Sequence, residues 1–439
     1  MSSTITLQTL KHPKILIYLF LTEMWERFSY YGMAAILLLY LKAPVAEGGL
    51  GWDLLKATQV NGLYKALVYL TPIIGGLLAD KVLGRFWAIL IGAALMAFGH
   101  LSLAFSGLFY FYAGLGLLVM GNGLFKPNIS TLIGEIYSPA NHLKELRESA
   151  YTIFYIGVNL GAFFGIGTCG WLAENKGWHY GFSVAGIGMC IGIVTFLLSQ
   201  TELKKYVHSV KKEDVDEPKA QLSAIDLNKI KYIVTMAMFT VIFWMAWEQG
   251  SSSLVIFAEQ HADLTVFNWE MPVSWVQNFN SLFIVILGLP LAAYWGYLET
   301  KNKNPDIIMK FVYALGILAI AFIGMIYCGI LAQNNTLLPL WMFFVFYLVQ
   351  TVAELFLSPL GLSMVAKHSP TGYGSTLMGV WLGATALANY LGSAVSGYID
   401  FIRDNYGYKV YFGGFAVLLF LAGFALFSLR KTLNNMLKD

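Results

Sequence analysis

Two carboxylates and a guanidinium lie close together near the start of the chain, in the sequence EMWERFSYYG at residues 23–32. They interrupt the first long apolar segment. At about 100° per residue, Glu23, Glu26 and Arg27 fall on one side of a helix, together with Tyr30. Ionisable groups inside such a segment are expensive to bury and mark a functional site by default. The pattern predicts a helix whose polar stripe faces a cavity; an ion-pair cluster that only locks helices together is the alternative.

Four further ionisable side chains lie inside apolar segments: Lys65 and Lys126 in the first half of the chain, Glu248 and Glu354 in the second. Opposite charges on two halves can pair in one state of a protein and separate in another. Burial without a partner raises the pKa of a carboxylate, and an adjacent base lowers it. This pattern is the physical basis of a proton-coupled switch. For either glutamate, a static ion pair is the alternative. For Lys126, the alternative is that its side chain extends to the membrane interface.

The composition identifies the class of protein. Of the 439 residues, 57% are hydrophobic and only 12% are charged, with a mean hydropathy of +0.63. Soluble domains carry about 25% charged residues. Apolar runs of about 20 residues recur along the whole chain, and the alternating strands of a membrane β-barrel are absent. The sequence predicts an all-α, multi-pass membrane protein, without a cleavable signal peptide at its start.

Hydropathy and helix-breaking residues predict twelve membrane spans. Most of the 28 Lys and Arg fall in the loops on the side of the two termini, so the positive-inside rule predicts cytoplasmic termini and a cytoplasmic membrane location. The predicted spans are roughly 13–41, 53–79, 86–106, 109–135, 149–172, 179–200, 230–259, 272–298, 307–331, 337–366, 374–399 and 410–430.

A charged stretch at about 201–229 divides the spans into six and six. We therefore expect an N-terminal six-helix bundle at 1–200, a cytoplasmic linker at 201–229 and a C-terminal six-helix bundle at 230–439. This is the pattern of the major facilitator architecture, in which the substrate site lies near the midplane between the halves. The sequence GGLLADKVLGR at 75–85 resembles the facilitator signature between helices two and three, where we expect Asp80 to pair with a base or cap a neighbouring helix.

Aromatic and amide side chains in the spans are candidates to line the same cavity, because Tyr and Trp combine apolar bulk with a polar group. For each of them, ordinary helix packing is the alternative. Besides Tyr30, they include Tyr69, Tyr155, Asn159, Asn280 and Trp381, and Ser358 shares the helix face of Glu354.

Together these residues resemble the proton-dependent oligopeptide transporter family, the peptide branch of the major facilitators. Residues 23–32 match the family motif ExxERFxYYG, and FYIGVNLG at 154–161 is similar to its FYxxINxG signature. The segment 121–130 is similar to the helix-four segment that contains the family's binding lysine. The resemblance covers nearly the whole chain and implies import of di- and tripeptides together with protons.

The resemblance also implies roles for individual residues. Glu23, Glu26 and Arg27 would couple protonation to transport, with Lys126 and Glu354. Lys126 would pair with Glu354 or hold the carboxylate of the substrate. Glu354 and Asn280 would hold its amino end. Tyr30, Tyr69 and Trp381 would line side-chain pockets. Apart from the resemblance, the further candidates for the substrate site are Lys65, Tyr155, Asn159, Glu248 and Ser358.

Two features depart from the family pattern. The stretch 201–229 is too short for the two extra helices that bacterial members usually carry between their halves. The family usually has an arginine on helix one that binds the peptide carboxylate and pairs with the helix-seven glutamate, and this chain has Ala34 there. Lys65 is an unexpected base in the second span. We hypothesise that it replaces this arginine and pairs with Glu248; an unrelated structural lysine is the alternative.

The sequence therefore predicts a proton-coupled peptide symporter that works as a monomer in the lipid bilayer. Because of Ala34, a proton-coupled transporter of another small peptide-like or amino-acid-derived solute remains the alternative, and a non-transporting peptide sensor is a more remote one. No metal-ligand spacing, nucleophile with a base in register or phosphate-binding loop is evident, so we expect no enzyme activity, no metal and no cofactor other than the coupling proton. The basic tracts are topology signals, and no nucleic-acid partner is expected.

Overall fold

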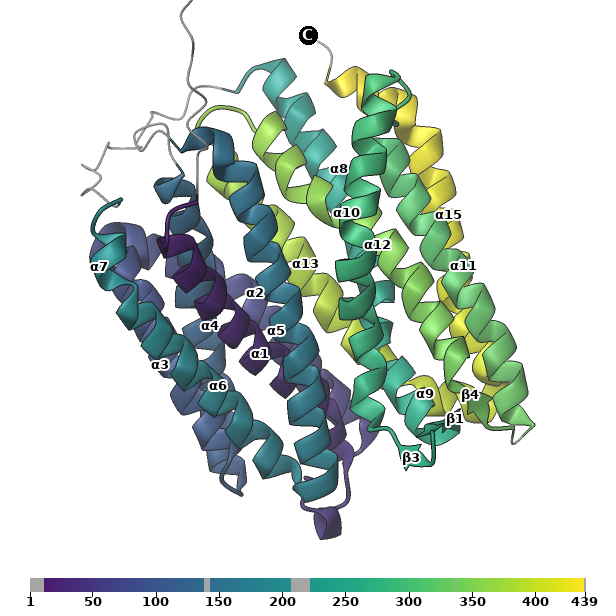
Figure 1. Cartoon of the computed structure of the whole chain (residues 1–439). Helices are drawn as coiled ribbons and strands as arrows, with labels where there is room; N and C mark the ends of the chain where they lie inside the picture. The colour runs from purple at the N-terminus through teal and green to yellow at the C-terminus, as the bar shows by residue number, and fades with distance from the viewer. Residues whose placement is uncertain (1–11, 138–142, 207–221, 335, 438–439) are drawn as a thin grey trace, which may run out of the picture. The chain divides into compact units, whose positions relative to one another are not determined.

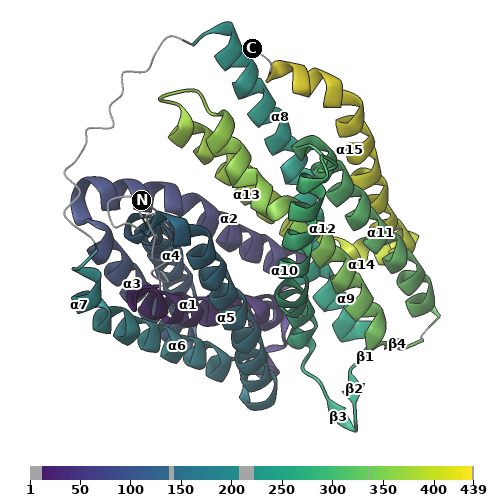
Figure 2. The same cartoon turned by 45° about the horizontal axis from the view of Figure 1, so that its top comes forward.

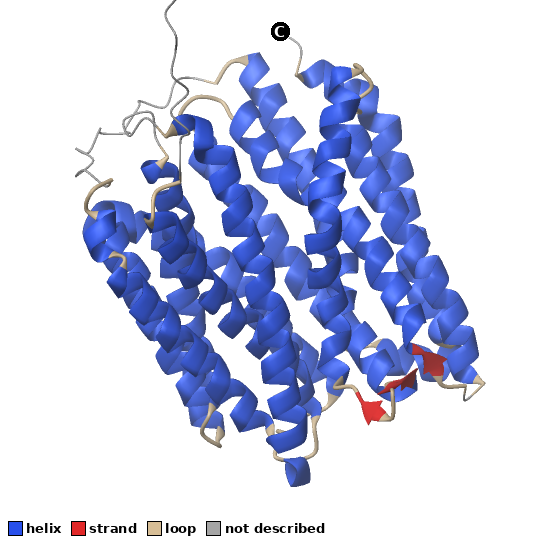
Figure 3. Ribbon diagram, viewed as in Figure 1, coloured by secondary structure: helices blue, strands red, loops and turns tan. Residues whose placement is uncertain are grey.

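The computed structural model describes residues 12–137, 143–206, 222–334 and 336–437. Nearly all of these residues are helical, and the few strands have two residues each (Figure 3). Twelve long helices follow one another along the described chain: α1 (Ile15–Lys42), α2 (Leu54–Leu78), α3 (Arg85–Leu103), α4 (Leu108–Ile136), α5 (Arg147–Lys176), α6 (Trp178–Leu198), α8 (Ala224–Trp247), α10 (Asn278–Thr300), α11 (Ile307–Gln333), α12 (Leu340–His368), α13 (Gly374–Ser396) and α15 (Tyr408–Met436).

These twelve helices have the length that a membrane span requires, about 20 residues for a bilayer core of about 30 Å. Ten of them are also apolar enough to cross a membrane on composition alone. The other two are α1, which contains the charged residues of the 23–32 motif, and α13, which is rich in glycine, alanine and serine. The prediction of twelve spans is confirmed.

Shorter elements connect the long helices. They are η1 (Val45–Glu47), the π-helical turn η2 (Ala79–Leu83), η4 (Lys144–Leu146), α7 (Gln200–Leu203), η5 (Glu248–Ser251), α9 (Ser253–His261), η6 (Val273–Gln277) and α14 (Ile399–Tyr406). Strand β1 (Ala262–Asp263) pairs in parallel with β4 (Leu338–Pro339), and β2 (Thr265–Val266) pairs in antiparallel with β3 (Trp269–Glu270).

The predicted seventh span, 230–259, is not one continuous helix. Helix α8 ends at Trp247, a 3-10 turn follows at η5, and α9 continues to His261. The sequence Gly250 to Ser253 explains the break, because glycine weakens a helix and serine hydroxyls compete for its backbone hydrogen bonds. The break places Glu248 at the end of a helix rather than inside one.

Helix α8 begins earlier than the predicted span. Ser223 accepts a hydrogen bond from the Asp226 N–H, and the Asp226 carboxylate accepts one from the Ser223 N–H. This capping box fixes the start of the helix at Ala224. Most of the predicted linker 201–229 lies outside the described residues, and its role as a boundary between two bundles stays a prediction.

The chain forms two compact units. Unit 1 comprises residues 1–33, 71–165 and 182–213, and unit 2 comprises residues 34–70, 166–181 and 214–439. In unit 1, α3 and α4 lie side by side (Figures 1 and 2). Arg85, the first residue of α3, pairs with both Asp80 and Glu135, so Asp80 pairs with a base, one of the two roles expected for it.

Close approach between α1 and α5 organises the charged part of unit 1. A Cβ atom added at Gly161 would lie 2.9 Å from the Cβ of Arg27, and one added at Gly165 would lie 2.8 Å from the Cα of Phe28. Small residues four apart allow two membrane helices to pack with their backbones in near contact. The glycines of α5 therefore position the helix that carries the 23–32 motif.

Unit 2 contains the helices from α8 onward, the last part of α1, most of α2, the last part of α5 and the start of α6. Helices α11 and α15 run side by side in both views (Figures 1 and 2), and the rings of Phe322 and Phe415 stack between them at 5.0 Å. The strands lie at one end of this unit, next to α9 (Figure 3). The segments of the first half thus pack directly against helices of the second half within unit 2.

Candidate functional site

The charged residues of α1 form one buried cluster in unit 1. The Arg27 Nε atom lies 2.8 Å from Glu23 Oε1 and 2.6 Å from Glu26 Oε2. Asn122 of α4 donates a hydrogen bond of 3.3 Å to Glu26 Oε1. The Tyr30 ring centre lies 5.7 Å from the Arg27 guanidinium carbon. These contacts confirm that the four α1 residues share one side of the helix.

The α1 cluster holds two carboxylates and one guanidinium, so it has one excess negative charge when all three groups are ionised. Glu26 is fully buried, and Glu23 and Arg27 are each 4% exposed. A buried excess charge is costly unless a proton or a nearby cation neutralises it. Lys126 follows Asn122 by one turn of α4, which places it on the helix face that meets Glu26. The cluster is thus suited to gaining and losing a proton.

A second buried carboxylate, Glu354 of α12, lies in unit 2. Its Oε2 atom accepts hydrogen bonds from Asn280 Nδ2 at 2.8 Å and from Trp247 Nε1 at 3.0 Å. Asn280 also donates to Thr351 Oγ1 at 2.9 Å. The described residues therefore bring together Glu354 and Asn280, as the family resemblance implies, and add a tryptophan.

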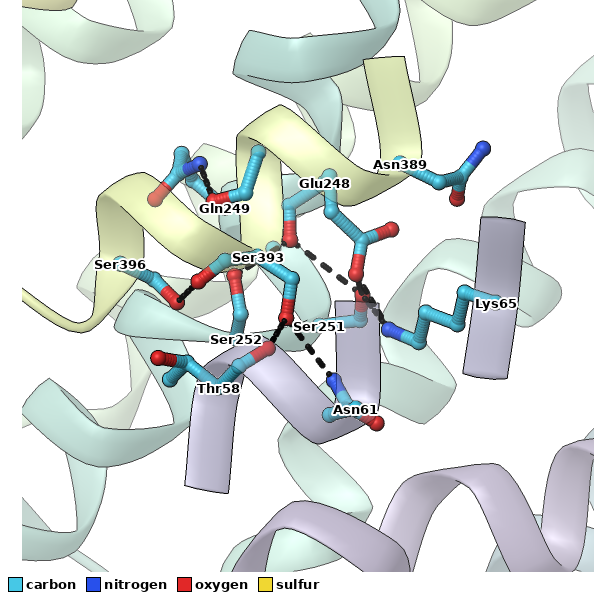
Figure 4. A network of polar contacts seen from close by, with 12 residues as sticks. Thr58, Asn61, Lys65, Glu248, Gln249, Ser251, Ser252, Asn389, Ser393 and Ser396 are labelled. Atoms are coloured by element: carbon cyan, nitrogen blue, oxygen red, sulfur yellow. Dashed lines mark hydrogen bonds and ion pairs between the residues drawn. The ribbon is translucent and has the colours of Figure 1, made fainter. Parts of the chain in front are cut away.

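Lys65 of α2 and Glu248 of η5 form a buried ion pair in unit 2 (Figure 4). Their side chains are 9% and 3% exposed. Ser251 lies between them: Lys65 Nζ donates to Ser251 Oγ at 3.0 Å, and Ser251 Oγ lies 2.9 Å from Glu248 Oε1. Buried ion pairs are stable only when such additional hydrogen bonds satisfy the charges. The predicted pairing of Lys65 with Glu248 is confirmed.

Polar side chains extend this network along α2 and α13 (Figure 4). Asn61, one turn before Lys65, donates to Ser393 Oγ at 3.2 Å, and Ser393 Oγ donates to the Thr58 carbonyl at 2.8 Å. On the other side of the turn, Gln249 Nε2 donates to the Gly392 carbonyl at 2.9 Å. The network links α2 of the first half to η5 and α13 of the second.

Another carboxylate joins segments of the two halves at a separate place in unit 2. Glu174, near the end of α5, accepts hydrogen bonds from the Val273 and Ser274 N–H groups, at 2.9 and 3.1 Å, and from Ser274 Oγ at 2.6 Å. These N–H groups begin η6 and have no partner within the helix. A carboxylate at a helix N-terminus is favourable, so Glu174 fastens α5 to the segment that leads into α10.

The remaining predicted site residues lie next to the charged groups, in helix packing or at an exposed position. Tyr69 follows Lys65 by one turn of α2, and Ser358 follows Glu354 by one turn of α12. Asn159 is buried and bonds the Tyr155 carbonyl on its own helix, while the Tyr155 side chain is exposed. Trp381 is part of the hydrophobic core of unit 2. The roles of these residues in substrate binding stay predictions.

Sequence reasoning did not assign Trp247, Ser251, Asn61, Ser393 or Glu174 to the site. The position of Trp247 directly before Glu248, an ionisable residue inside an apolar span, is the one signal that pointed to it. The contacts of the other four depend on which helices pack together, and a single sequence does not contain that information.

Comparison with known proteins identifies the family. The family model described as POT family matches residues 86–225 and 220–407. The chain belongs to the POT family. The two matched segments meet at 220–225, inside the stretch predicted as a linker.

Curated relatives align over most of the chain. A transporter of Bacillus subtilis (strain 168) that is called YclF and described as uncharacterized is 31% identical, covering 97% of this chain and 95% of its own length. The peptide transporter YePEPT of Yersinia enterocolitica is 30% identical, covering 88% of each chain. A di-/tripeptide transporter of Lactococcus lactis subsp. cremoris is 28% identical over 97% of each chain.

Solved POT structures share the fold. A mutant form of a peptide transporter POT is 28% identical, has a TM-score of 0.86 and covers 97% of this chain and 96% of its own. A structure of a POT family transporter in complex with 5-aminolevulinic acid is 26% identical, with a TM-score of 0.83 and coverage of 96% of this chain and 97% of its own. The chain is a multi-pass membrane protein with this twelve-helix architecture.

Alignment length bears on the number of helices. The alignment with the Bacillus relative extends over 483 positions and this chain has 439 residues, so the relative has at least 44 residues that this chain lacks. Two membrane crossings need about 20 residues each. The difference is large enough to hold two crossings, and the described residues of this chain form twelve long helices.

Proposed function

We propose that the chain is a proton-coupled symporter that imports di- and tripeptides by alternating access, as a monomer and without enzymatic chemistry or a cofactor. Membership of the POT family and similarity to proteins named di-/tripeptide transporters support this proposal. The observation that carries it is the distribution of buried charge over the α1 cluster, the Lys65–Glu248 pair and Glu354.

Each charged group has a distinct task in this proposal. The α1 cluster has the excess negative charge that a proton can neutralise. Glu354 receives only neutral donors from the described residues, so its charge is available to the amino end of a peptide. Lys126, on the face of α4 that meets the α1 cluster, supplies the cation for the peptide carboxylate. A solute that carries both an ammonium and a carboxylate group then satisfies charges that are otherwise costly to bury.

The Lys65–Glu248 pair has a different task, because both charges are already satisfied by each other. Its two residues come from segments of the two sequence halves that pack together in unit 2. Opening of the outer side requires these segments to part, so the pair has to break. A proton on Glu248 would remove the attraction and favour opening, with Glu174 releasing η6 in the same step.

A second candidate substrate class deserves a test because of Ala34. In this chain the cation beside Glu248 is a lysine of α2 rather than an arginine of α1, and an ammonium lacks the bidentate geometry of a guanidinium. A POT relative has been solved in complex with 5-aminolevulinic acid and another in complex with alafosfalin. A small amino-acid-derived solute is therefore the alternative.

Counterflow in liposomes distinguishes these two classes. Purified protein is reconstituted with unlabelled dialanine inside and a trace of labelled dialanine outside, at equal pH on both sides. Our proposal predicts entry of the label, with competition by trialanine and weak or no competition by N-acetyl-dialanine, alanine or 5-aminolevulinic acid. No entry of dialanine, together with counterflow of labelled 5-aminolevulinic acid, would favour the alternative; Glu354→Gln protein provides the matched inactive control.

A further inference from the structure

The two oxygens of the Glu354 carboxylate have different surroundings. Oε2 accepts both hydrogen bonds, from Asn280 Nδ2 at 2.8 Å and from Trp247 Nε1 at 3.0 Å. Within the described part of the chain, Oε1 accepts none. Two donors that converge on one oxygen fix the rotation of the carboxylate. They leave Oε1 as the atom that can bind a ligand.

Trp247 is itself held firmly by α12. Gln350, one turn before Glu354, donates from Nε2 to the Trp247 carbonyl at 2.7 Å. Tyr347 donates from its hydroxyl to the Gly250 carbonyl at 2.5 Å. These bonds attach the main chain to α12 directly before the η5 turn and within it. The main chain at Trp247 is therefore anchored to α12, the same helix that carries the Glu354 carboxylate that the indole contacts.

The two buried glutamates of unit 2 differ in the kind of donor that they receive. Glu248 receives the ammonium of Lys65, which satisfies its charge. Glu354 receives an indole N–H and an amide N–H, which are neutral and satisfy its hydrogen bonding without cancelling its charge. An indole N–H cannot be an acceptor, so it orients a carboxylate without competing for a cation.

We propose that Trp247 is a positioning residue for substrate recognition: its indole N–H holds Glu354 Oε2, so that Oε1 is presented to the ammonium group of the transported solute. This inference rests on the proposed function and refines it by naming the residue that sets the orientation of Glu354. It also distinguishes Trp247 from Trp244, whose ring packs against it at 5.3 Å.

The test replaces the indole with a ring that lacks the donor. In Trp247→Phe protein, we expect KM for dialanine to rise about tenfold, the effect of losing a hydrogen bond to a charged group, with kcat changed by less than about twofold. Trp341→Phe is the matched control, because Trp341 is on α12, the helix that carries Glu354, but is 60% exposed. Trp247→His retains a ring N–H and is expected to recover part of the affinity.

A second readout separates positioning from general packing. Affinity is measured for dialanine and for propionyl-alanine, which has the same backbone but no amino group. We expect Trp247→Phe to weaken dialanine binding about tenfold and to leave propionyl-alanine binding unchanged. Equal weakening of both ligands, or a fall in kcat at unchanged KM, would overturn the inference. Lack of any dialanine transport by the unmodified protein would instead overturn the proposed function on which the inference rests.

Discussion

Lys65 of α2 and Glu248 of η5 are 183 residues apart in the sequence and form a buried ion pair, with Ser251 hydrogen-bonded to the lysine ammonium and to the glutamate carboxylate. The pair supplies the cation that the family resemblance led us to expect from position 34. The pair agrees with the hypothesis that Lys65 takes the place of that arginine as the partner of Glu248. In the function proposed above, the pair breaks when the outer side opens, because it joins segments of the two sequence halves.

Removal of the lysine charge is predicted to impair transport strongly. In Lys65→Gln protein, Glu248 is left buried without its cation, and breaking a buried pair from one side costs about 3–5 kcal/mol. We expect gradient-driven uptake of dialanine to fall at least about tenfold and the thermal stability of the purified protein to drop. Lys65→Arg should retain part of the activity. Full activity and an unchanged pH dependence in Lys65→Gln would show that Lys65 is only a structural lysine.

A rescue experiment tests whether Lys65 of α2 takes the place of the arginine that the family resemblance led us to expect at position 34 of α1. If Lys65 has the role of the family arginine, adding Ala34→Arg to Lys65→Gln should restore part of the lost uptake, because a guanidinium on α1 would then pair with Glu248. Leu63→Arg on the Lys65→Gln background is the matched control, since Leu63 is 52% exposed. Equal recovery with both arginines, or no recovery with Ala34→Arg, would argue against the replacement.

The α1 cluster is predicted to couple transport to protons. Glu26→Gln removes the excess negative charge, so there is no longer a charge for a proton to neutralise. We expect gradient-driven accumulation of dialanine to be lost while counterflow at equal pH persists at a reduced rate. Loss of both activities in a folded protein would instead assign Glu26 to substrate binding or to structure.

The Glu174 contact is predicted to contribute to stability. In Glu174→Gln protein, an amide replaces a carboxylate that accepts three hydrogen bonds, and hydrogen bonds to charged groups contribute about 1.5–3 kcal/mol each. We expect a lower midpoint of thermal unfolding, whereas Glu270→Gln, at an exposed position in β3, should leave it unchanged. Equal midpoints for all three proteins would mean that η6 is held without Glu174.

Asp306 provides a stability prediction with a defined pH dependence. Burial opposes its ionisation, but hydrogen bonds from the Met309 N–H, Arg430 and Asn434 outweigh burial and hold the pKa of Asp306 below its usual value. A depressed carboxylate pKa stabilises the folded state above the unfolded pKa, near 4, and this contribution is lost as the pH falls through the folded pKa.

We therefore expect Asp306→Ala, which removes the N-cap of α11, to lower the free energy of unfolding by about 1 kcal/mol at pH 7. The difference from the unmodified protein should shrink as the pH falls below about 4. Thermal unfolding across this pH range is the measurement. A difference that stays constant down to pH 3 would show that the charge of Asp306 contributes nothing.

The number of spans and the residues of the α1 cluster were predictable because each depends on local sequence. Glu23, Glu26 and Arg27 share a helix, and helical periodicity alone places them together. The Lys65–Glu248 pair was predictable for a different reason: each side chain is too costly to bury alone, and the missing arginine left Glu248 in need of a cation. Charge balance in an apolar environment thus constrains partners that are distant in sequence.

Other contacts could not be predicted because at least one partner in each is an uncharged group, which does not require an opposite charge. The Trp247 indole and the Ser393 hydroxyl can each be satisfied in many ways, so their partners depend on the packing of α12 and α2. The break at η5 was not predicted because the apolar run continues on both sides of Gly250. The mean hydropathy of the whole span therefore does not register it. Glu174 binds backbone N–H groups, which every residue except proline has.

Gradient-driven uptake by reconstituted protein is the most direct test of the account. Labelled dialanine is supplied outside liposomes with an acidic exterior, with and without a proton ionophore. We predict accumulation of dialanine above its outside concentration, loss of that accumulation when the ionophore is present, and no accumulation by Glu26→Gln protein. Accumulation that persists with the ionophore, or equilibration without accumulation by folded protein, would contradict proton-coupled peptide transport.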